Sequence, residues 1–478
     1  MNDGRKTVGV LYLAMNNVGD VAANAIATGE FEAAEAMLTA ALATDPGDAM
    51  DLRVVLAQCL SKQLRFEEAI ALWIRILETP DVPGGARLSA TNGLAICAMQ
   101  SGKPGIVRPY VDRMGFRTSP YPSDRCWRPR ILGVAGYVEE AEAELRELLA
   151  ECPGDPFITH MLGSTMMQRG DPAGQLHDLA YSSRAFFGPY YPHTPLLDRM
   201  WEGEPLEGRS LAIIPHGGYG DYFQFVRHVP QLRRLGVGRI VAVAHSRCHG
   251  LILSTGVDAV VDQDEAEEAR SACDLWVTTF GLARAGGTSA APYLRAPPSA
   301  GVDAILRSMR ARAAGRPCIG LYWHSDMQGG EIKSIPLPPL APVFARKDIH
   351  WVVLQRGFAL REMRRAGVGL DATVMGEDMT FDESGALITG LDGVATICAW
   401  PFHLAGALGT RTWLLAGRVM DARHMNRERE SVLYPGCATL VRQPSPGDWP
   451  GAIARLMAEL DAFILARGLP VPPAPAPC

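Results

Sequence analysis

The sequence predicts an α-helical repeat array followed by two α/β units in tandem, each built on a parallel sheet. Two observations predict this class: helical apolar stripes recur at a fixed spacing in the N-terminal part, and from Ser210 onward short apolar runs alternate with helical stretches. A chain of 478 residues is also long enough for about three domains. We therefore expect a helical domain over 1–195, α/β domains over 196–314 and 315–468, and a proline-rich tail over 469–478.

The helical part carries copies of one pattern. Gly-Glu-Phe-Glu-Ala-Ala at 29–34 and Arg-Phe-Glu-Glu-Ala at 65–69 open two copies about 34 residues apart, Gly-Tyr-Val-Glu-Glu-Ala at 136–141 opens another, and 101–103 marks a degenerate copy. Proline-containing turns close the copies at 45–48, 79–80 and 152–155. This period, with small residues where helices cross, resembles the tetratricopeptide repeat, whose helix pairs stack into a curved solenoid with a concave groove. Another kind of helical array is the alternative. Solenoids of this type usually bind peptides or proteins, so we expect a protein partner.

The second part shows the alternation of strands and helices that is typical of open α/β sheets. Short β-type runs lie at Ser210–Pro215, Arg239–Ala244, Asp258–Val261 and Asp274–Thr279, and then at Cys318–Trp323, Ile349–Gln355, Ala372–Met375, Gly393–Ile397 and Thr412–Leu415. The break at 190–195 is expected to be a linker, and the helix ending near Ala314 a crossover. Two such series indicate two doubly wound, Rossmann-like domains that face a cleft.

Composition narrows the classes of function. With 47% hydrophobic residues the chain can bury a core, which excludes disorder for its bulk, and a net charge of −6 argues against a dedicated nucleic-acid binder. No apolar run approaches the roughly 18 residues of a membrane helix, and the run at 8–15 is short and weakly flanked for a signal peptide. The ten cysteines stand singly, without a Cys-x-x-Cys pair. This usage favours reduced thiols in a cytoplasmic protein over a zinc ribbon or a disulfide scaffold.

The strongest local signal follows the first strand of the second part, where His216 to Gly220 form a glycine-rich turn that opens a helix. Glycines let the backbone turn sharply and approach a ligand closely, and Asp221 would sit on the first helical turn, facing the cleft. Gln224 follows one turn later. A helix N-cap is the alternative role for Asp221.

Two further segments follow strands of the second α/β series. Residues 322–325 end its first strand, and Lys333 comes shortly afterwards in a chain where lysine is scarce among the 46 basic residues. This lysine would contact a phosphate as a point charge, the alternative being a solvated loop lysine. Residues 400–409 form a strand-loop-helix junction, whose helix start would direct unpaired N–H groups at a diphosphate. His403 within it is either a site residue or a hydrogen-bonded packing residue.

Together these segments resemble the GT-B glycosyltransferases related to ADP-heptose:lipopolysaccharide heptosyltransferases, in the subgroup that carries N-terminal tetratricopeptide repeats. The resemblance covers most of the chain and includes the segments 201–209, 354–357 and 444–449. It implies an inverting displacement in which Asp221 deprotonates the acceptor hydroxyl, with His216 as the next candidate for the base, while positive groups stabilise the departing nucleotide diphosphate. Substrate-binding roles are implied for Gly218, Gly220, Gln224, Tyr322, Ser325, Lys333, Gln355, Trp400, Phe402 and His403.

The same resemblance implies no cofactor beyond the nucleotide-sugar donor and no metal site. The one Asp-x-Asp match, at 262–264, is interpreted as a solvated helix start. The chain departs from the family pattern at several places: Cys398-Ala399 stands where relatives usually carry Asp-Thr, Lys333 where they usually carry arginine, and His216 where they often carry glutamate. The residues at 400–402 are also bulkier than the small ones usual there. These changes are compatible with a different donor or with a weakened enzyme.

The leading hypothesis is a cytoplasmic glycosyltransferase that moves a sugar to a Ser or Thr hydroxyl of a protein captured by the repeat array. Flagellin-modifying enzymes are one setting that the resemblance implies. Two alternatives remain open: the same reaction on a lipid-linked or oligosaccharide acceptor, and a repeat scaffold whose transferase domain is inactive.

Overall fold

The structure, a computed structural model, describes residues 18–44, 50–114, 119, 121–174, 179–187, 197–327, 329–368, 372–376 and 378–468. The expected turn at 45–48, the linker at 190–195, the apolar run at 8–15 and the tail at 469–478 lie outside these residues.

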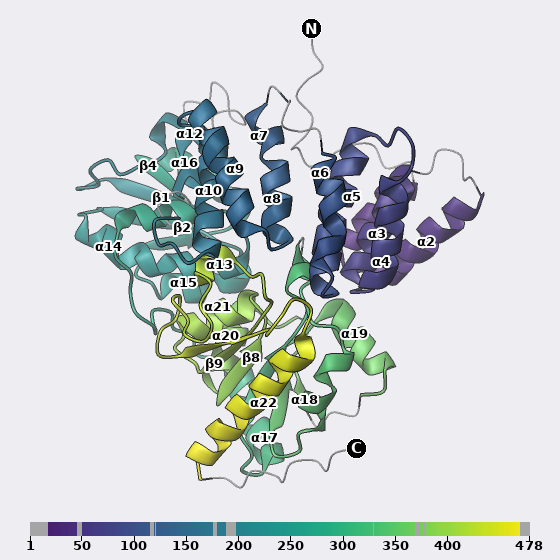
Figure 1. Ribbon diagram of the computed structural model, residues 1–478. Coiled ribbons are helices and arrows are strands. Elements are labelled where there is room, and N and C mark those ends of the chain that lie inside the picture. Colours follow the sequence, from purple (N-terminus) through teal and green to yellow (C-terminus); the bar gives the residue numbers. More distant parts are fainter. Residues whose placement is uncertain are drawn as a thin grey trace.

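The N-terminal part is a helical array, as the sequence predicts. Its elements are α1 Val18–Ala27, α2 Phe31–Thr44, α3 Met50–Lys62, α4 Phe66–Leu77, α5 Gly84–Gln100, η1 Pro104–Val107, α6 Arg108–Asp112, α7 Pro122–Arg125, α8 Trp127–Val134, α9 Val138–Glu151, α10 Pro156–Gln168, η3 Leu179–Ser182 and α12 Arg184–Phe187. Successive helices pack on one another in pairs (Figure 1). The three predicted repeat openings coincide with the starts of α2, α4 and α9.

A small residue at a helix crossing explains how close two of these helices come. Trp73 of α4 is 1% exposed, and its indole lies over Gly93 of α5. A Cβ at position 93 would come within 2.5 Å of that ring. At the crossing of α4 and α5, a small residue is therefore required because any larger side chain at position 93 would clash with Trp73.

The N-terminal α/β unit carries a four-stranded sheet in the order β3-β2-β1-β4, with all strand pairs parallel. Its strands are β1 Ser210–Ile214, β2 Arg239–Val243, β3 Ala259–Val261 and β4 Leu275–Thr278. Its helices are η4 Leu197–Arg199, α13 Tyr219–Phe225, η5 Val226–His228, α14 Val229–Arg234, η6 Ser246–Cys248, α15 His249–Leu253, η7 Gln263–Glu265, α16 Ala266–Ala272 and η8 Phe280–Ala285. Each strand lies within two residues of its predicted position.

The C-terminal α/β unit has a six-stranded parallel sheet in the order β10-β9-β8-β5-β6-β7. Its strands are β5 Cys318–Tyr322, β6 His350–Val353, β7 Ala372–Val374, β8 Gly393–Thr396, β9 Thr412–Ala416 and β10 Ala438–Arg442. Its helices are α17 Ala300–Ala313, η9 Gly330–Ile332, η10 Pro338–Leu340, α18 Ala341–Ala345, α19 Gly357–Arg365, α20 Phe381–Thr389, α21 Trp400–Ala407, η11 Ala422–His424 and α22 Trp449–Ala466. The edge strand β10 was not predicted. The helix α17 was expected to end the first α/β unit, but it packs on β5 and α20 of the second unit.

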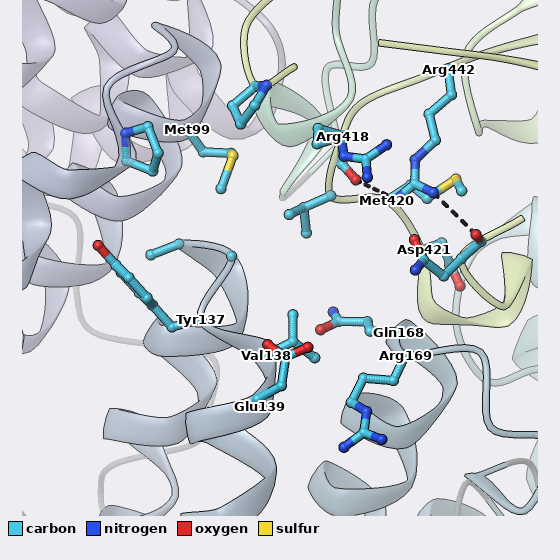
Figure 2. A pocket seen from close by; sticks show the side chains of 16 residues that line it. Met99, Tyr137, Val138, Glu139, Gln168, Arg169, Arg418, Met420, Asp421 and Arg442 are labelled. Atoms are coloured by element: carbon cyan, nitrogen blue, oxygen red, sulfur yellow. Dashed lines mark hydrogen bonds between the residues drawn. The ribbon is translucent and has the colours of Figure 1, made fainter. Parts of the chain in front are cut away.

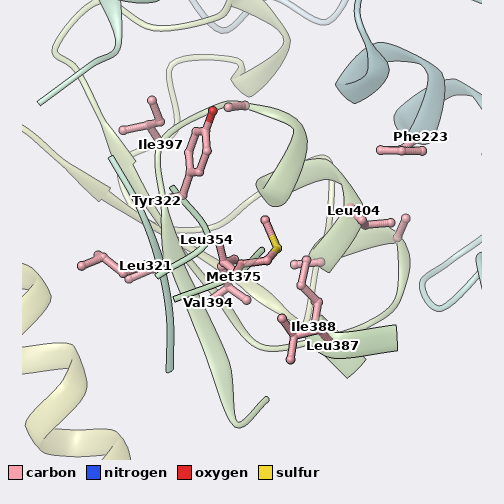
Figure 3. Close-up of a cluster of buried hydrophobic side chains, with 14 of the residues drawn as sticks. Phe223, Leu321, Tyr322, Leu354, Met375, Leu387, Ile388, Val394, Ile397 and Leu404 are labelled. Carbon is pink, nitrogen blue, oxygen red and sulfur yellow. The ribbon is translucent and has the colours of Figure 1, made fainter. Parts of the chain in front are cut away.

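One apolar cluster connects the parts. Figure 3 shows Leu321 and Val394 of the C-terminal sheet, Leu404 of α21 and Phe223 of α13, which all belong to this cluster, so the cluster extends into the N-terminal unit. Phe31 of α2 joins it through the ring of Phe358 on α19, with the ring centroids 5.0 Å apart. The predicted class, a helical repeat array followed by two parallel α/β units, is confirmed.

The array spans both α/β units (Figure 1). Its first helices lie over the C-terminal unit, where Arg361 donates to the Gly29 carbonyl at 2.8 Å and Lys62 pairs with Glu331 at 2.7 Å. Towards its other end, α10 reaches η11 of the same unit and also packs against η3, which contacts η8 of the N-terminal unit. Cavities therefore form where three parts of the chain meet. No helix among the described residues is long and apolar enough to cross a membrane.

Candidate active site

Asp221 is presented by the turn that connects β1 to α13. The chain passes through Gly217 with φ +85°, a conformation that favours glycine, and α13 then begins after Gly218. Asp221 Oδ2 accepts a hydrogen bond from the Gly218 N–H at 2.8 Å. Gly218 is the N-cap residue and Asp221 the third residue of α13, so the carboxylate completes a capping box and is not itself the N-cap. Capping uses only one of its two oxygens.

Arg423, from η11 of the C-terminal unit, contacts the other oxygen of that carboxylate. Its Nη1 lies 2.8 Å from Asp221 Oδ1 and 3.3 Å from Gln224 Oε1. Asp421 holds the arginine in turn, since Asp421 Oδ1 accepts from the Arg423 backbone N–H at 2.9 Å and from Nε at 3.2 Å. Desolvation by itself would raise the pKa of Asp421, but the guanidinium of Arg423 outweighs it and holds the pKa below its ordinary value. An ionised Asp421 therefore anchors the arginine that joins the two units at Asp221.

Lys333 lines a separate pocket, which we call the Lys333 pocket. It has a volume of about 200 Å³ and is formed by Gly329, Ile332, Lys333, Cys398, Leu414, Leu415, Ala416, Gly417, Val419, Met420 and Asp421. Most of these residues follow the carboxyl ends of parallel strands, where open α/β sheets bind their ligands. No hydrogen bond or ion pair of the Lys333 ammonium is found among the described residues, so its charge is available to an anion in the pocket.

A buried polar cluster lies behind that pocket. Cys398 Sγ is 3.4 Å from His424 Nε2 and 3.8 Å from His403 Nε2, and His403 Nδ1 is 3.1 Å from the Tyr434 hydroxyl. Burial raises the pKa of the Cys398 thiol to about 12 and lowers the pKa of His403 well below 6.5. The cluster is therefore uncharged at neutral pH. His403 is 6% exposed and packs on Gly220, which matches the packing alternative for this histidine.

His216 lies in an aromatic cluster at the edge of the helical array. Its ring stacks on Tyr181 at 4.6 Å and meets the edge of Phe280 at 5.1 Å. Burial lowers its pKa from 6.5 to about 4, and its Nδ1 is buried without a hydrogen-bond partner among the described residues. The histidine is thus neutral at pH 7 and surrounded by rings.

The remaining predicted residues hold the loop after β5 or pack in the core. Gln355 is 1% exposed, accepts from the Trp323 and His324 N–H groups, and donates to the His324 carbonyl at 3.1 Å. The buried Ser325 is held through its N–H by the Ser334 hydroxyl at 2.9 Å. Gln355 thus shapes the loop through its side-chain amide, and Ser325 is held in that loop through its backbone.

Three aromatic predictions differ in their access to a ligand. The Tyr322 ring, 8% exposed, meets the ring of the half-buried Trp400 edge to face at 5.9 Å. Phe402 is completely buried, among Cys398, Leu414 and Tyr434. The structure therefore groups Asp221, Gly218 and Gln224 at one place and Lys333 near it, while Phe402 belongs to the core.

A larger cavity separates the helical array from the C-terminal unit, and we call it the array cavity. Figure 2 shows Tyr137, Val138, Glu139, Gln168 and Arg169 of the array facing Arg418, Met420, Asp421 and Arg442 across a space of about 510 Å³. Val419, Met420 and Asp421 line both the array cavity and the Lys333 pocket. This short segment therefore borders both spaces.

Arg423 and Asp421 are the site residues that sequence reasoning missed. A signal was available, because Asp-Ala-Arg-His at 421–424 is a polar group shortly after the strand at 412–416, the position where α/β proteins bind ligands. Nothing in the sequence, however, indicates that Arg423 meets a carboxylate 202 positions away. Among the described residues, no group of three or more His, Cys, Asp and Glu is arranged to hold a metal ion.

A family model of the tetratricopeptide repeat matches residues 25–82. The chain is similar to the structure of a glycosyl transferase family 9 protein from Veillonella parvula, with 11% identity and a TM-score of 0.42 over 56% of this chain and all of that one. It is also similar to ADP-heptose lps heptosyltransferase II of E. coli, with 16% identity and a TM-score of 0.38 over 54% of this chain and 99% of that one.

A third similar structure spans nearly the whole chain. It is an O-GlcNAc transferase mutant from Thermobaculum terrenum, with 13% identity and a TM-score of 0.33 over 94% of this chain and 92% of that one. No curated protein matches the sequence significantly. The chain thus contains a tetratricopeptide-type segment at 25–82, which lies within a helical array. This array is joined to two parallel α/β units.

Proposed function

We propose that the chain is an inverting, metal-independent glycosyltransferase of the GT-B type that moves a sugar from a nucleotide sugar to a hydroxyl group of a protein. One observation carries the proposal: the carboxylate of Asp221 stands where the two α/β units meet, linked through Arg423 and Asp421 to the pocket that Lys333 lines. A base and an anion-binding lysine in adjoining spaces are the two groups that the displacement needs.

The reaction balances with these residues. The acceptor oxygen forms a bond to the anomeric carbon while the bond from that carbon to the diphosphate oxygen breaks, and the electron pair leaves with the nucleoside diphosphate. Asp221 takes the hydroxyl proton, since an ionised carboxylate has about four acceptor positions and Gly218 and Arg423 occupy two. Lys333 stabilises the charge on the leaving group.

The protein acceptor is proposed from the array. Its tetratricopeptide-type segment, residues 25–82, belongs to a class of solenoid that presents a concave binding surface. The array cavity opens between later parts of the same array, at Met99, Tyr137 and Gln168, and the C-terminal unit. A cytoplasmic setting is supported by the cysteines, because those that the structure describes are all free thiols.

The first test is donor binding, measured by titration calorimetry with ADP, UDP, GDP and CDP against the full-length chain. We expect one of them to bind, and Lys333→Ala to weaken it about tenfold or more through loss of the charged contact. Lys347→Ala is the matched control, since Lys347 is an exposed lysine before β6, at the opposite ends of the strands. Binding of none of the four would favour an inactive scaffold, the reading that Cys398 and Ala399 motivate.

The second test is transfer. Asp221→Asn should retain nucleotide binding and lose turnover, while the melting temperature stays nearly unchanged because Arg423 keeps its contacts to Asp421. Full turnover in this variant would remove Asp221 as the base. A pull-down with the full chain, with and without substitutions on the array cavity, separates a protein acceptor from a lipid-linked or oligosaccharide one.

A further inference from the structure

A third cavity lies directly beside the candidate base, and we call it the α13 cavity. Its volume is about 420 Å³. Its walls come from the helical array, from α13, η5 and η8 of the N-terminal unit, and from the segment before β10 of the C-terminal unit. They consist of Met167, Leu179, Gln224, Phe225, Arg227, His228, Phe280, Ala283, Gly287, Thr288, Arg423, Val432 and Leu433.

Arg227 is a buried cation in this wall, with 8% exposure. Its Nε donates to the Gln224 carbonyl at 2.9 Å, Nη1 to the Leu433 carbonyl at 2.8 Å, and Nη2 to the Tyr293 hydroxyl at 3.2 Å. The guanidinium lies over the rings of Tyr293 and Tyr434, 5.0 and 4.8 Å from their centroids. All of these partners are neutral, and among the described residues they leave part of the five N–H groups of the guanidinium for a further acceptor.

The balance of charge around the cavity is positive. Its described lining contains two arginines and no aspartate or glutamate. The charge of Arg423 is met by Asp221 and Asp421, whereas no carboxylate pairs with Arg227 among the described residues. Buried charges are ordinarily paired, because desolvation without a counter-ion is costly, and aromatic faces offset only part of that cost. The cavity is therefore suited to an anionic group.

The position of the cavity indicates which substrate supplies that anion. It shares Gln224 and Arg423 with the surroundings of Asp221, so a ligand there lies next to the base. It shares no described lining residue with the Lys333 pocket, which the proposed function assigns to the donor. Met167 and Leu179 of the array complete the wall, so a polypeptide bound by the array can place a side chain there.

We infer that the α13 cavity is an acceptor subsite that binds a carboxylate side chain, so that the modified Ser or Thr lies close in sequence to an Asp or Glu of the acceptor. This inference rests on the proposed function for the identity of the acceptor. It goes beyond that function in stating what the acceptor must carry. Arg227 is the residue that binds this carboxylate.

A carboxylate introduced by substitution in the cavity wall tests, without any ligand, whether the α13 cavity favours an anion. Thr288 is an exposed residue of the cavity wall, and Thr288→Glu brings a carboxylate into it, with Thr288→Gln as the uncharged control of equal size. We expect Thr288→Glu to melt at a higher temperature than Thr288→Gln at pH 7, and the difference to vanish below about pH 4 as the carboxylate is protonated. Equal melting temperatures at pH 7 would contradict the inference. Substitution of Arg227 itself is avoided, since it ties the two units together.

Peptide binding tests the specificity. The probes are fluorescein-labelled nonapeptides with a central Ser flanked by Glu or, as control, by Gln, titrated with the full-length chain and followed by anisotropy. We expect the wild type and the Thr288→Gln variant to bind the Glu peptide about tenfold more tightly than the Gln peptide. The Thr288→Glu variant should bind the two peptides with equal affinity. No preference in the wild type, or a preference that persists in Thr288→Glu, would overturn the inference.

The same variants also test whether the anion in the α13 cavity is the diphosphate of the donor rather than a carboxylate of the acceptor. If Thr288→Glu, but not Thr288→Gln, abolished binding of ADP or UDP and left peptide binding unchanged, the cavity would hold the diphosphate of the donor and the inference would be wrong. Both the melting and the peptide measurements are independent of turnover. A chain that prefers the Glu peptide but transfers no sugar would refute the proposed function alone.

Discussion

Gly220 of α13 and His403 of α21 are in contact across the boundary between the two α/β units. A Cβ at position 220 would come within 2.8 Å of His403 Cδ2, a distance shorter than van der Waals contact. Asp221 is the next residue along α13, so the position of the candidate base depends on how closely the C-terminal unit approaches. Glycine at position 220 allows that approach.

The first prediction is that Gly220→Ala impairs turnover by displacing α13 from α21. The buried His403 has hydrogen-bond partners on both ring nitrogens and cannot move without losing them, so we expect a stability loss of about 1–3 kcal/mol and a reduced kcat. Gly301→Ala is the matched control, because Gly301 is likewise the second residue of its helix, α17, and its Cβ would come no closer than 3.8 Å to a neighbour, at Ser299 Oγ. Urea denaturation and steady-state kinetics check both variants. Equal behaviour of the two would show that the approach is not tight.

The second prediction concerns Arg423 as a positioning residue for Asp221. Arg423→Gln removes the contact to Asp221 Oδ1 and should lower kcat while the KM for the nucleotide sugar changes little, because the Lys333 pocket is left intact. Arg423→Lys, which keeps the charge, should restore part of the lost kcat. Arg429→Gln serves as the control, since Arg429 is 71% exposed and pairs with Glu459. A change confined to KM would instead place Arg423 at the donor.

The third prediction separates the two candidates for the base. His216→Phe should retain turnover, because the ring of His216 stacks on Tyr181 and phenylalanine keeps that stacking. The backbone hydrogen bond from His216 to the Thr279 hydroxyl is unaffected by the change. Loss of turnover at an unchanged melting temperature would make His216 a member of the catalytic machinery.

The fourth prediction is a loss of stability in mild acid. Burial lowers the pKa of His216, His228 and His424 from 6.5 to about 4, so the unfolded chain binds protons more readily than the folded one between these values. The contribution of the neutral histidines is fully present above about pH 6.5 and is lost as the pH falls towards 4. Melting temperatures across this range should therefore drop, and His216→Phe should drop less. A flat profile between pH 6.5 and 4 would contradict the burial argument.

The fifth prediction tests the array. Gly93→Ala inserts a methyl group within 2.5 Å of the Trp73 indole and should cost about 1–3 kcal/mol, more than the gain in helix propensity. Gly85→Ala, on the same helix with open space around its Cβ, should be neutral or slightly stabilising. Chemical denaturation monitored by tryptophan fluorescence compares the two.

The elements were predictable where local patterns carry the information. The helix starts at Phe31 and Phe66 and the strands β1 to β9 follow from apolar periodicity and from turn residues, which act over a few positions. The missed strand, β10, is a short edge strand beyond the turn at Pro435 and Gly436, and its pairing with β9 is a tertiary event. For the same reason the sequence pattern proposed Asp221 and Lys333, which follow strand ends, and also Phe402, which occupies a helix start but faces the core.

By itself, the sequence determined the order of the three parts, the period of the array and the turn that carries Asp221, because each of these is encoded within a few tens of residues. Only the tertiary structure decided the strand orders, the burial of His216 among rings, and the meeting of Arg423 with Asp221 and of Arg227 with the α13 cavity. Such contacts depend on how separate apolar surfaces pack together. The free energy that favours one packing comes from many residues throughout the core, so no short segment of sequence determines it.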